Sequence, residues 1–326
     1  MGSVDGKIAG PLHARPVVAV VGATATGKSS FAEDLAVRLD GEIVSADSMQ
    51  VYRGMDIGTA KVPVHERRVP YHCIDVVDPG QPFSAALYQR LARESIETVY
   101  ARGKVPIVCG GTGLYVKAAL DNLIFPAGEQ VGNEVRDRYL RLAGEHGADW
   151  LHSQLEQVDK ASADLIAPNN VRRVVRAFEM LADGTSYAEQ RSHASELLPY
   201  YDTVYLGLSV TTGILYERID SRVDEMLADG LLEEVRHLVD AGFAEAITSS
   251  QAIGYKEFLP FLDSQEPLDS EAFLEAAECV KRSTRRYAKR QRTWFKRDAR
   301  INWIAADEPL GQAALQQALE LIRLHG

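Results

Sequence analysis

An apolar run that leads through a glycine loop into a helix constrains this chain more than any other feature. Residues 16–21 (PVVAVV) are typical of a buried parallel strand, and apolar residues recur at helical spacing over 31–39. Between them stands Gly22-Ala23-Thr24-Ala25-Thr26-Gly27-Lys28-Ser29, a match to G-x-x-x-x-G-K-[ST]. Loop amides and a helix N-terminus converge on an anion in this setting, Lys28 adds positive charge, and Ser29 offers a hydroxyl to a magnesium ion. The sequence therefore predicts a phosphate-binding loop.

Polar residues follow two more strand-like runs. Asp47 comes after the run that begins at Gly41, and Thr112 stands in Gly110-Gly111-Thr112-Gly113 after the run 105–109. Ligands bind beyond the carboxyl ends of parallel strands, so Asp47 is a candidate for chemistry beside the phosphate loop. Thr112 is a candidate donor to a phosphate oxygen. The same patterns also fit an aspartate that caps a turn and a tight glycine turn.

The pattern turns helical between residues 123 and 198, and a strand-like run returns at 203–210. We therefore predict an α/β fold: a P-loop NTPase-like parallel sheet flanked by helices, with a helical insertion. The expected parts are a loose N-terminal lead-in over 1–15, a core domain over 16–122 and 199–326, and a helical insertion domain over 123–198.

Two pairs of arginines lie four residues apart on predicted helices. Arg172 and Arg176, with Arg173 between them, suit phosphates or a splayed base, or else form a solvated helix face. Arg218 and Arg222 suit a bidentate clamp on a diphosphate, or else pair with acidic residues at 217, 220 and 224.

Basic residues concentrate near the C-terminus of an otherwise acidic chain. The net charge is −10, yet residues 281–300 hold ten Lys or Arg against one acidic residue, Asp298. Tyr287, Trp294 and Phe295 are interleaved with these cations. Such a segment indicates a polyanionic partner and suits stacking on unpaired bases.

Cysteine usage and hydropathy point to a cytoplasmic protein. Cys73, Cys109 and Cys279 show no C-x-x-C spacing, so neither a disulfide framework nor a zinc module is indicated. Neither a signal peptide nor a stretch long enough to span a bilayer is apparent. We expect no membrane partner, no obligate protein partner, and a monomer.

A phosphate loop favours a small-molecule kinase by default. A nucleoside triphosphatase usually carries a second, metal-holding aspartate at the end of an apolar strand. The runs 105–109 and 203–210 both end without an acidic residue. Another diphosphate compound is therefore worth considering.

Five motifs in order resemble the tRNA dimethylallyltransferase family. They are GATATGKS at 22–29, DSMQVYRGMDIGTAK at 47–61, GGTGLY at 110–115, QAIGYKE at 251–257 and TRRYAKRQ at 284–291. The likeness extends from about Pro16 to Trp303, and its second and last motifs are highly specific. Ala23 stands where many members have a proline. The cysteines of the zinc finger that eukaryotic members carry are missing, so the chain resembles the bacterial form.

The resemblance implies transfer of a dimethylallyl group from dimethylallyl diphosphate to the exocyclic amine of the adenine 3′ of the anticodon. The diphosphate is expected on the loop 22–29, with Mg²⁺ bridging it to Ser29. Thr112 and Arg222, with Arg218 less certain, would stabilise the departing oxygens as the carbon–oxygen bond breaks.

The resemblance also implies how the tRNA anticodon stem-loop is held. Asp47 would accept the proton of the attacking amine, and the adenine would leave its stack to reach it. The expected tRNA-binding residues are Asp47, Ser48, Met49, Gln50, Thr112, Arg136, Arg172, Arg173, Arg176, Arg285, Arg286, Lys289 and Arg290.

Two other functions are distinguishable from prenyl transfer. A small-molecule kinase predicts ATP turnover without RNA and has no use for the basic segment 281–300. A nonenzymatic RNA-binding module predicts RNA affinity that survives replacement of Asp47 and Thr112, and has no need of a phosphate loop.

Overall fold

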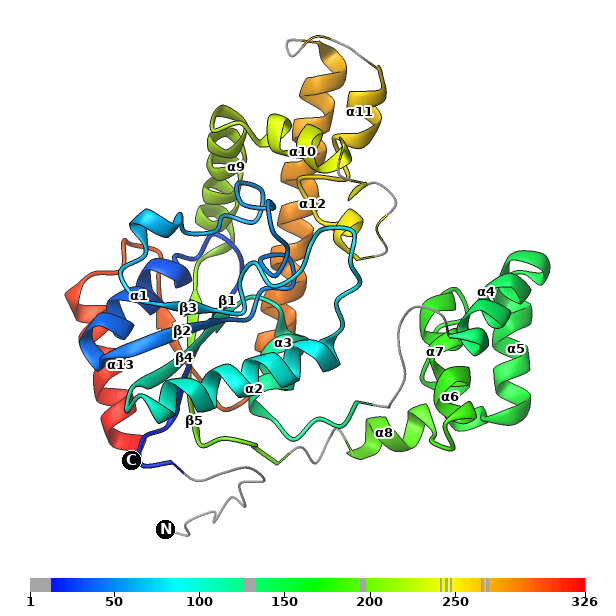
Figure 1. Cartoon of the computed structure of the whole chain (residues 1–326), viewed down its shortest axis with the longest axis horizontal. Coiled ribbons are helices and arrows are strands. Elements are labelled where there is room, and N and C mark those ends of the chain that lie inside the picture. The colour runs from blue at the N-terminus through cyan, green and yellow to red at the C-terminus, as the bar shows by residue number, and fades with distance from the viewer. Residues whose placement is uncertain are drawn as a thin grey trace. The chain divides into compact units, whose positions relative to one another are not determined.

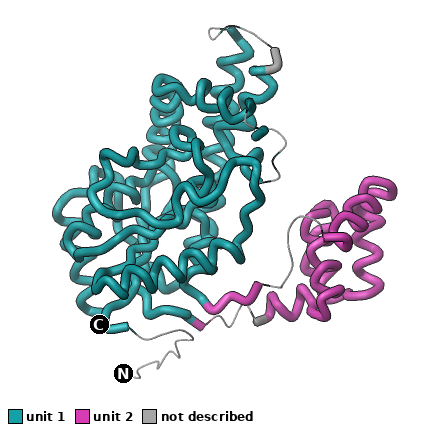
Figure 2. Tube along the Cα trace, in the orientation of Figure 1, with its two compact units in different colours: residues 1–121, 199–326 teal, residues 122–198 magenta. Residues whose placement is uncertain are grey.

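The computed structural model of the chain describes residues 13–125, 133–193 and 198–325, apart from 241, 244–245, 247, 265–266 and 268–269. It divides into two compact units, which Figure 2 shows in different colours: Met1–Asp121 with Pro199–Gly326, and Asn122–Leu198. The second unit begins one residue before the helical insertion that the sequence predicts. Asp121 and Pro199 form an antiparallel bridge, so the chain leaves and re-enters the first unit at adjacent points.

The first unit contains a six-stranded parallel sheet with the strand order β3-β2-β4-β1-β5-β6 (Figure 1). The predicted α/β fold is thereby confirmed. The strands are β1 (Val17–Gly22), β2 (Gly41–Ser45), β3 (Tyr71–His72), β4 (Val105–Gly110), β5 (Thr203–Ser209) and β6 (Ile301–Ala305).

Helices pack on both faces of this sheet. On one face α1 and α13 contact each other and the strands, and on the other face lie α2, α3 and α12. The helices of this unit are α1 (Lys28–Leu39), α2 (Ala85–Ala101), α3 (Gly113–Leu120), α9 (Thr212–Ala228), α10 (Leu231–Asp240), α11 (Leu259–Ser264), α12 (Glu271–Phe295) and α13 (Gln312–His325). Among the described residues, Val64–Glu66 and Ser249–Gln251 form short 3₁₀ helices. In the described part of the chain, no helix combines the length and apolarity needed to cross a membrane.

Strand β1 is central because its β-branched run can be buried on both faces. All six of its residues are buried, and it pairs with β4 on one side and β5 on the other. Phe31 and Leu35 of α1 belong to the same apolar core as Val18 and Val20. The pairing places Val21 beside Gly110, so the loop after β1 and the loop after β4 start at the same edge.

A close backbone contact brings the loop after β2 to that edge as well. The N–H of Ala46 donates to Cys109 O at 2.8 Å, and the N–H of Thr112 donates to Ala46 O at 3.1 Å. A Cβ at Gly110 would lie 2.2 Å from the oxygen of Ala46, so only glycine fits there. Asp47 and Thr112 are therefore held close to each other.

The second unit contains α4 (Glu134–His146), α5 (Ala148–Val158), α6 (Lys160–Asp164), α7 (Val171–Ala182) and α8 (Tyr187–His193). Its apolar core includes Leu151 and Leu155 of α5 and Val174 and Phe178 of α7. The ring of Tyr139 stacks on that of Phe178, with centroids 3.9 Å apart. This unit thus has a core of its own.

Gln291 joins α12 to the loops at the carboxyl ends of β1 and β4. Its side chain is 5% exposed. Its Oε1 accepts a hydrogen bond from the N–H of Thr24 at 2.9 Å, and its Nε2 donates to Gly111 O at 2.9 Å. Since one amide side chain satisfies a donor in one loop and an acceptor in the other, Gln291 fixes the spacing of the two loops.

Replacing Gln291 by leucine is expected to lower the free energy of unfolding by about 1–3 kcal/mol, because Thr24 N–H and Gly111 C=O lose their partner. Chemical denaturation measures this change. Gln316→Leu, at an exposed position of α13, is the control and is expected to change stability by about 0.5 kcal/mol or less. Equal stability of the two variants would show that Gln291 has no such role.

Candidate active site

The phosphate loop, residues 22–29, joins the end of β1 to the start of α1. Ala25 and Gly27 have positive φ angles of 61° and 84°, and Gly27 is the N-cap of α1. The Thr26 hydroxyl donates to Ala23 O at 2.9 Å and tightens the turn. Glycine adopts this left-handed conformation without a steric penalty, and the helix N-terminus faces the loop. The backbone therefore has the geometry of an anion site.

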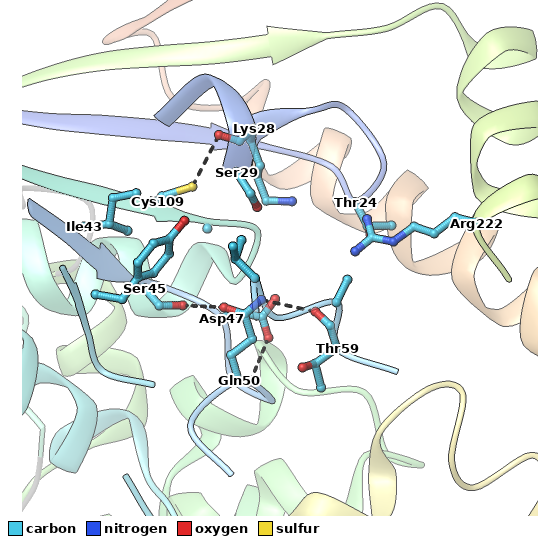
Figure 3. Close-up of a pocket in the computed structure, with 14 residues that line it drawn as sticks. Thr24, Lys28, Ser29, Ile43, Ser45, Asp47, Gln50, Thr59, Cys109 and Arg222 are labelled. Carbon is cyan, nitrogen blue, oxygen red and sulfur yellow. Dashed lines mark hydrogen bonds between the residues drawn. The ribbon is translucent and has the colours of Figure 1, made fainter. Parts of the chain in front are cut away.

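Two pockets beside the phosphate loop share Thr24, Lys28, Asp47, Thr59 and Arg222. The inner pocket, drawn in Figure 3, also reaches Ser29, Ser45 and Gln50. The outer pocket extends to α9, to residues 251–256 and to α12. The space unfilled by atoms, including that open to solvent, is about 540 Å³ in the inner and about 1110 Å³ in the outer pocket.

Two cations face the shared space. Lys28 points into it from α1 and Arg222 from α9, on the side opposite Asp47 (Figure 3). Burial lowers the pKa of the Lys28 ammonium; Arg222 adds to this shift, and Asp47 opposes it. Burial also lowers the pKa of the Arg222 guanidinium, against the influence of Asp47. An anion between these cations would stabilise the charged form of both.

Cys109 also lines the inner pocket, beside Lys28. Its thiol donates to the backbone oxygen of Lys28 at 3.7 Å. Burial raises the pKa of this thiol to about 12, so Cys109 is a neutral thiol at physiological pH. Its role in the pocket wall is one of packing, because a nucleophilic cysteine needs to be a thiolate.

Asp47 lines both pockets and also caps a turn. Its Oδ1 accepts from the N–H of Met49 at 2.9 Å and from that of Gln50 at 3.4 Å. Its Oδ2 has no hydrogen-bond partner among the described residues. The two interpretations of Asp47 are thus compatible, because one oxygen fixes the carboxylate and the other is available to a ligand.

Thr112 contacts Ser48 and lines neither pocket. Its Oγ1 accepts from the N–H of Ser48 at 3.1 Å and donates to the Ser48 hydroxyl at 3.3 Å. Its hydroxyl proton is therefore directed to Ser48, and its contacts support the turn that carries Asp47. Ser48 and Met49 line the outer pocket, whereas Gln50 lines the inner one.

Arg218 is directed away from the shared space, contrary to its expected place beside the diphosphate. Its guanidinium donates to Ala306 O at 2.8 Å and to Asp307 O at 2.6 Å. These carbonyls follow β6, so Arg218 ties α9 to the end of that strand. Its donors are engaged there, so Arg218 is not among the residues that line the two pockets, whereas Arg222 lines both.

Within the helical unit, two of the predicted tRNA-binding arginines have an internal partner. Arg136 Nε lies 2.6 Å from Glu179 Oε1, and Arg176 Nη1 lies 2.9 Å from Glu179 Oε2. Glu179 is 2% exposed, so these pairs compensate a buried charge. Arg172 and Arg173 are exposed.

The predicted cations of α12 also differ from one another. Arg285 pairs with Asp220 of α9, whereas Arg286, Lys289 and Arg290 are exposed. Arg290 lines the outer pocket, with its guanidinium carbon 5.5 Å from the ring centroid of Tyr287.

The apolar side of the outer pocket was not predicted from the sequence. Ile219 and Met226 lie three residues before and four after Arg222 on α9, and Ile253 and Val280 face the same space. The spacing of Ile219 and Met226 from Arg222 indicates that all three share one face of α9, and this was available from the sequence. Gln251 and Lys256, from the motif at 251–257, also line the outer pocket.

The donor set of the inner pocket suits a magnesium ion held chiefly by a ligand's phosphates. Among the described residues, no group of three or more His, Cys, Asp or Glu could hold a metal. Ser29 and Asp47 supply oxygens to the inner pocket. Magnesium commonly takes one or two protein oxygens and completes its shell with water and substrate phosphates.

A family model described as "IPP transferase" matches residues 50–298. A relative from Geobacillus thermodenitrificans named tRNA dimethylallyltransferase is 47% identical over 297 residues, 90% of this chain and 91% of the relative. A relative of the same name from Salinispora tropica is 44% identical over 324 residues, 99% of this chain and 96% of the relative.

Solved structures agree with these relatives. A tRNA isopentenylpyrophosphate transferase from Staphylococcus epidermidis has a TM-score of 0.68 at 38% identity, covering 95% of this chain and all of that one. A eukaryotic dimethylallyltransferase, described as acting on tRNA, has a TM-score of 0.79 at 29% identity, covering 94% of this chain and 78% of that one. The sequence matches and the shared fold agree, and the chain belongs to the IPP transferase family.

Proposed function

We propose that this chain transfers a dimethylallyl group from dimethylallyl diphosphate to the N6 amine of the adenine 3′ of a tRNA anticodon and releases diphosphate. The observation that carries the proposal is the convergence of Lys28, Arg222 and Asp47 on one space beside the phosphate loop. Family membership and the tRNA named for the relatives support it. They do not support the kinase alternative.

Departure of the diphosphate is the step for which the cations are suited. As the carbon–oxygen bond breaks, negative charge accumulates on the diphosphate and allylic cation character on carbon. Lys28, Arg222 and the loop amides would stabilise that negative charge more strongly than the charge of the bound ester. The apolar residues Ile219, Met226 and Ile253 would hold the five-carbon chain.

Attack by the amine needs a proton acceptor. The N6 nitrogen forms its bond to the allylic carbon, and its proton passes to the free Oδ2 of Asp47 while Oδ1 stays with the turn. The adenine has to leave its stack for this, at a cost of a few kcal/mol. Met49 of the Asp47 turn and Arg290 line the outer pocket and are candidates to hold that base.

A magnesium ion bound between Ser29 and the diphosphate would supply further positive charge to the leaving group. Ser29 follows Lys28 at the start of α1 and lines the inner pocket. Its side-chain oxygen has no hydrogen-bond partner among the described residues, which suits it to this role.

The remaining tRNA contacts are assigned to exposed cations. Arg286, Lys289 and Arg290 on α12, and Arg172 and Arg173 on α7, are solvent-accessible. Arg136, Arg176 and Arg285 are less suited to phosphate contact, because each is paired with an acidic side chain of its own unit.

Single-turnover transfer of labelled dimethylallyl diphosphate to an unmodified anticodon stem-loop tests the function. We expect label in the RNA at the adenine 3′ of the anticodon, and loss of the transfer when magnesium is chelated. Labelled ATP run in parallel distinguishes the kinase. ATP hydrolysis without any RNA label would overturn the proposal, and full transfer in excess chelator would overturn the magnesium assignment.

Asp47→Asn is expected to lower the transfer rate by about 10²–10⁴-fold, because the amide keeps the Oδ1 contacts but cannot accept the proton. Rapid-quench kinetics measures the rate, and filter binding of the stem-loop shows whether RNA affinity is retained. Asp40→Asn, at an exposed position with φ 52° that asparagine tolerates, is the control. A wild-type rate for Asp47→Asn would exclude Asp47 as the base.

Arg222→Gln and Arg218→Gln are expected to have different effects although the residues lie one helical turn apart. Loss of Arg222 removes a donor to the leaving group and should lower kcat/KM about 10²–10³-fold. Loss of Arg218 removes its bonds to Ala306 and Asp307 and should lower thermal stability with little change in kcat/KM. The opposite pattern would return the diphosphate contact to Arg218.

A further inference from the structure

A loop formed by residues 55–61, called here the wall loop, lines both pockets. Gly58 and Thr59 face the outer pocket, and Thr59 and Ala60 the inner one. The segment has no helix or strand. Its internal hydrogen bonds include Thr59 Oγ1 to Met55 O at 2.6 Å, Ala60 N–H to Ile57 O at 2.9 Å and Lys61 N–H to Asp56 O at 3.0 Å, but none of them is donated by the N–H groups of residues 56–58. Its position therefore depends on contacts from other parts of the fold.

Glu234 of α10 supplies the largest group of those contacts. Its Oε2 accepts from the N–H groups of Asp56 at 2.9 Å and Ile57 at 2.8 Å. Its Oε1 accepts from the N–H of Gly58 at 3.1 Å and from the Tyr255 hydroxyl at 2.6 Å. One carboxylate thus receives four hydrogen bonds, three of them from consecutive amides of the wall loop. Hydrogen bonds to a charged acceptor are stronger than neutral ones.

Tyr255 contacts both Glu234 and the wall loop. Burial, and then the charge of Glu234, raises the pKa of the Tyr255 hydroxyl well above its ordinary value, so the group remains protonated and donates. A Cβ at Gly58 would lie 2.5 Å from the Tyr255 ring. The wall loop can approach the ring this closely only because residue 58 is glycine.

The other end of the wall loop is held by Lys61. Its side chain is 3% exposed, and its ammonium donates to Tyr52 O at 2.6 Å and to the carboxylates of Asp56 at 2.7 Å and Asp75 at 2.6 Å. Gln50 Nε2 donates to Thr59 O at 3.2 Å. Lys61 and Gln50 thus hold this end, and Lys61 also bonds to Asp56, whereas the N–H groups of Ile57 and Gly58 are held by Glu234.

We propose that Glu234, which lines neither pocket, is a positioning residue that holds the wall loop against the diphosphate and prenyl site. The inference rests on the proposed function, because the site that the loop borders is the one proposed to bind dimethylallyl diphosphate. Without Glu234 the amides of residues 56–58 would turn to water, and Gly58 and Thr59 would move with them. A displacement of about 1 Å at a reacting site can cost about 10²-fold in rate.

Glu234→Gln tests the inference with Glu233→Gln as its matched control. Gln presents an NH₂ group where the carboxylate has an oxygen, so it cannot accept all four bonds. Glu233 is the neighbouring residue, is more than half exposed, and pairs only with Arg236 among the described residues. Both changes remove one negative charge from the same turn of α10. We expect kcat/KM for dimethylallyl diphosphate to fall about 10–100-fold in Glu234→Gln alone, with stem-loop affinity unchanged.

Hydrogen exchange at amides 56–58 provides a readout independent of activity. We expect faster exchange there in Glu234→Gln and no change in Glu233→Gln. Tyr255→Phe, which removes one of the four donors and keeps the ring, should show smaller effects in the same direction and serves if Glu234→Gln does not fold. Wild-type exchange and wild-type kinetics in a folded Glu234→Gln protein would overturn the inference.

The outcomes also separate this inference from the proposed function. A wild-type protein without transfer activity would reject the proposed function, while exchange at residues 56–58 would still report whether Glu234 holds the loop. Faster exchange with unchanged kcat/KM in Glu234→Gln would limit Glu234 to a structural role and overturn the positioning claim.

Discussion

The site depends on the pairing of β1 with β4 and β5. Strand β1 is fully buried and is paired on both sides, so the position of its carboxyl end at the edge of the sheet is fixed. The phosphate loop starts at that point. The pairing brings Gly110 beside Val21, and the missing side chain of Gly110 admits the backbone of Ala46. The phosphate loop, the Asp47 turn and the Thr112 loop are thus three products of one arrangement of strands.

The electrostatics of the site follow from the same arrangement. Lys28 and Arg222 line a shared, partly buried space, and the negative charge of Asp47 acts on both of them. Burial lowers the pKa of both cations, and a nearby anion would favour their charged forms. In the proposed reaction, the same side chains would therefore bind the leaving group and stabilise its charge.

The sequence was sufficient to predict the parallel sheet, the phosphate loop and the turn after β2, because each depends on local pattern and on the rule that strand ends meet at one edge. It could not tell Arg218 from Arg222, since helical spacing gives a shared face but not the carbonyls that Arg218 meets after β6. Nor could it reveal that Glu179 engages Arg136, or that Glu234 and Gln291 hold loops far away in sequence. Those contacts are tertiary, and no local signal marks them, whereas Arg176 and Glu179 lie three residues apart on α7, a spacing typical of a helical ion pair.

The bridge between Asp121 and Pro199 brings the two ends of the helical unit together, which makes this unit easy to alter in evolution. The helical unit leaves and rejoins the sheet unit at neighbouring points and has an apolar core of its own. It could therefore be lengthened, exchanged or shortened to a turn without altering a single strand pairing. Under the proposed function, changes at Arg172 and Arg173 of that unit would alter RNA contacts while the chemistry at the sheet edge stays as it is.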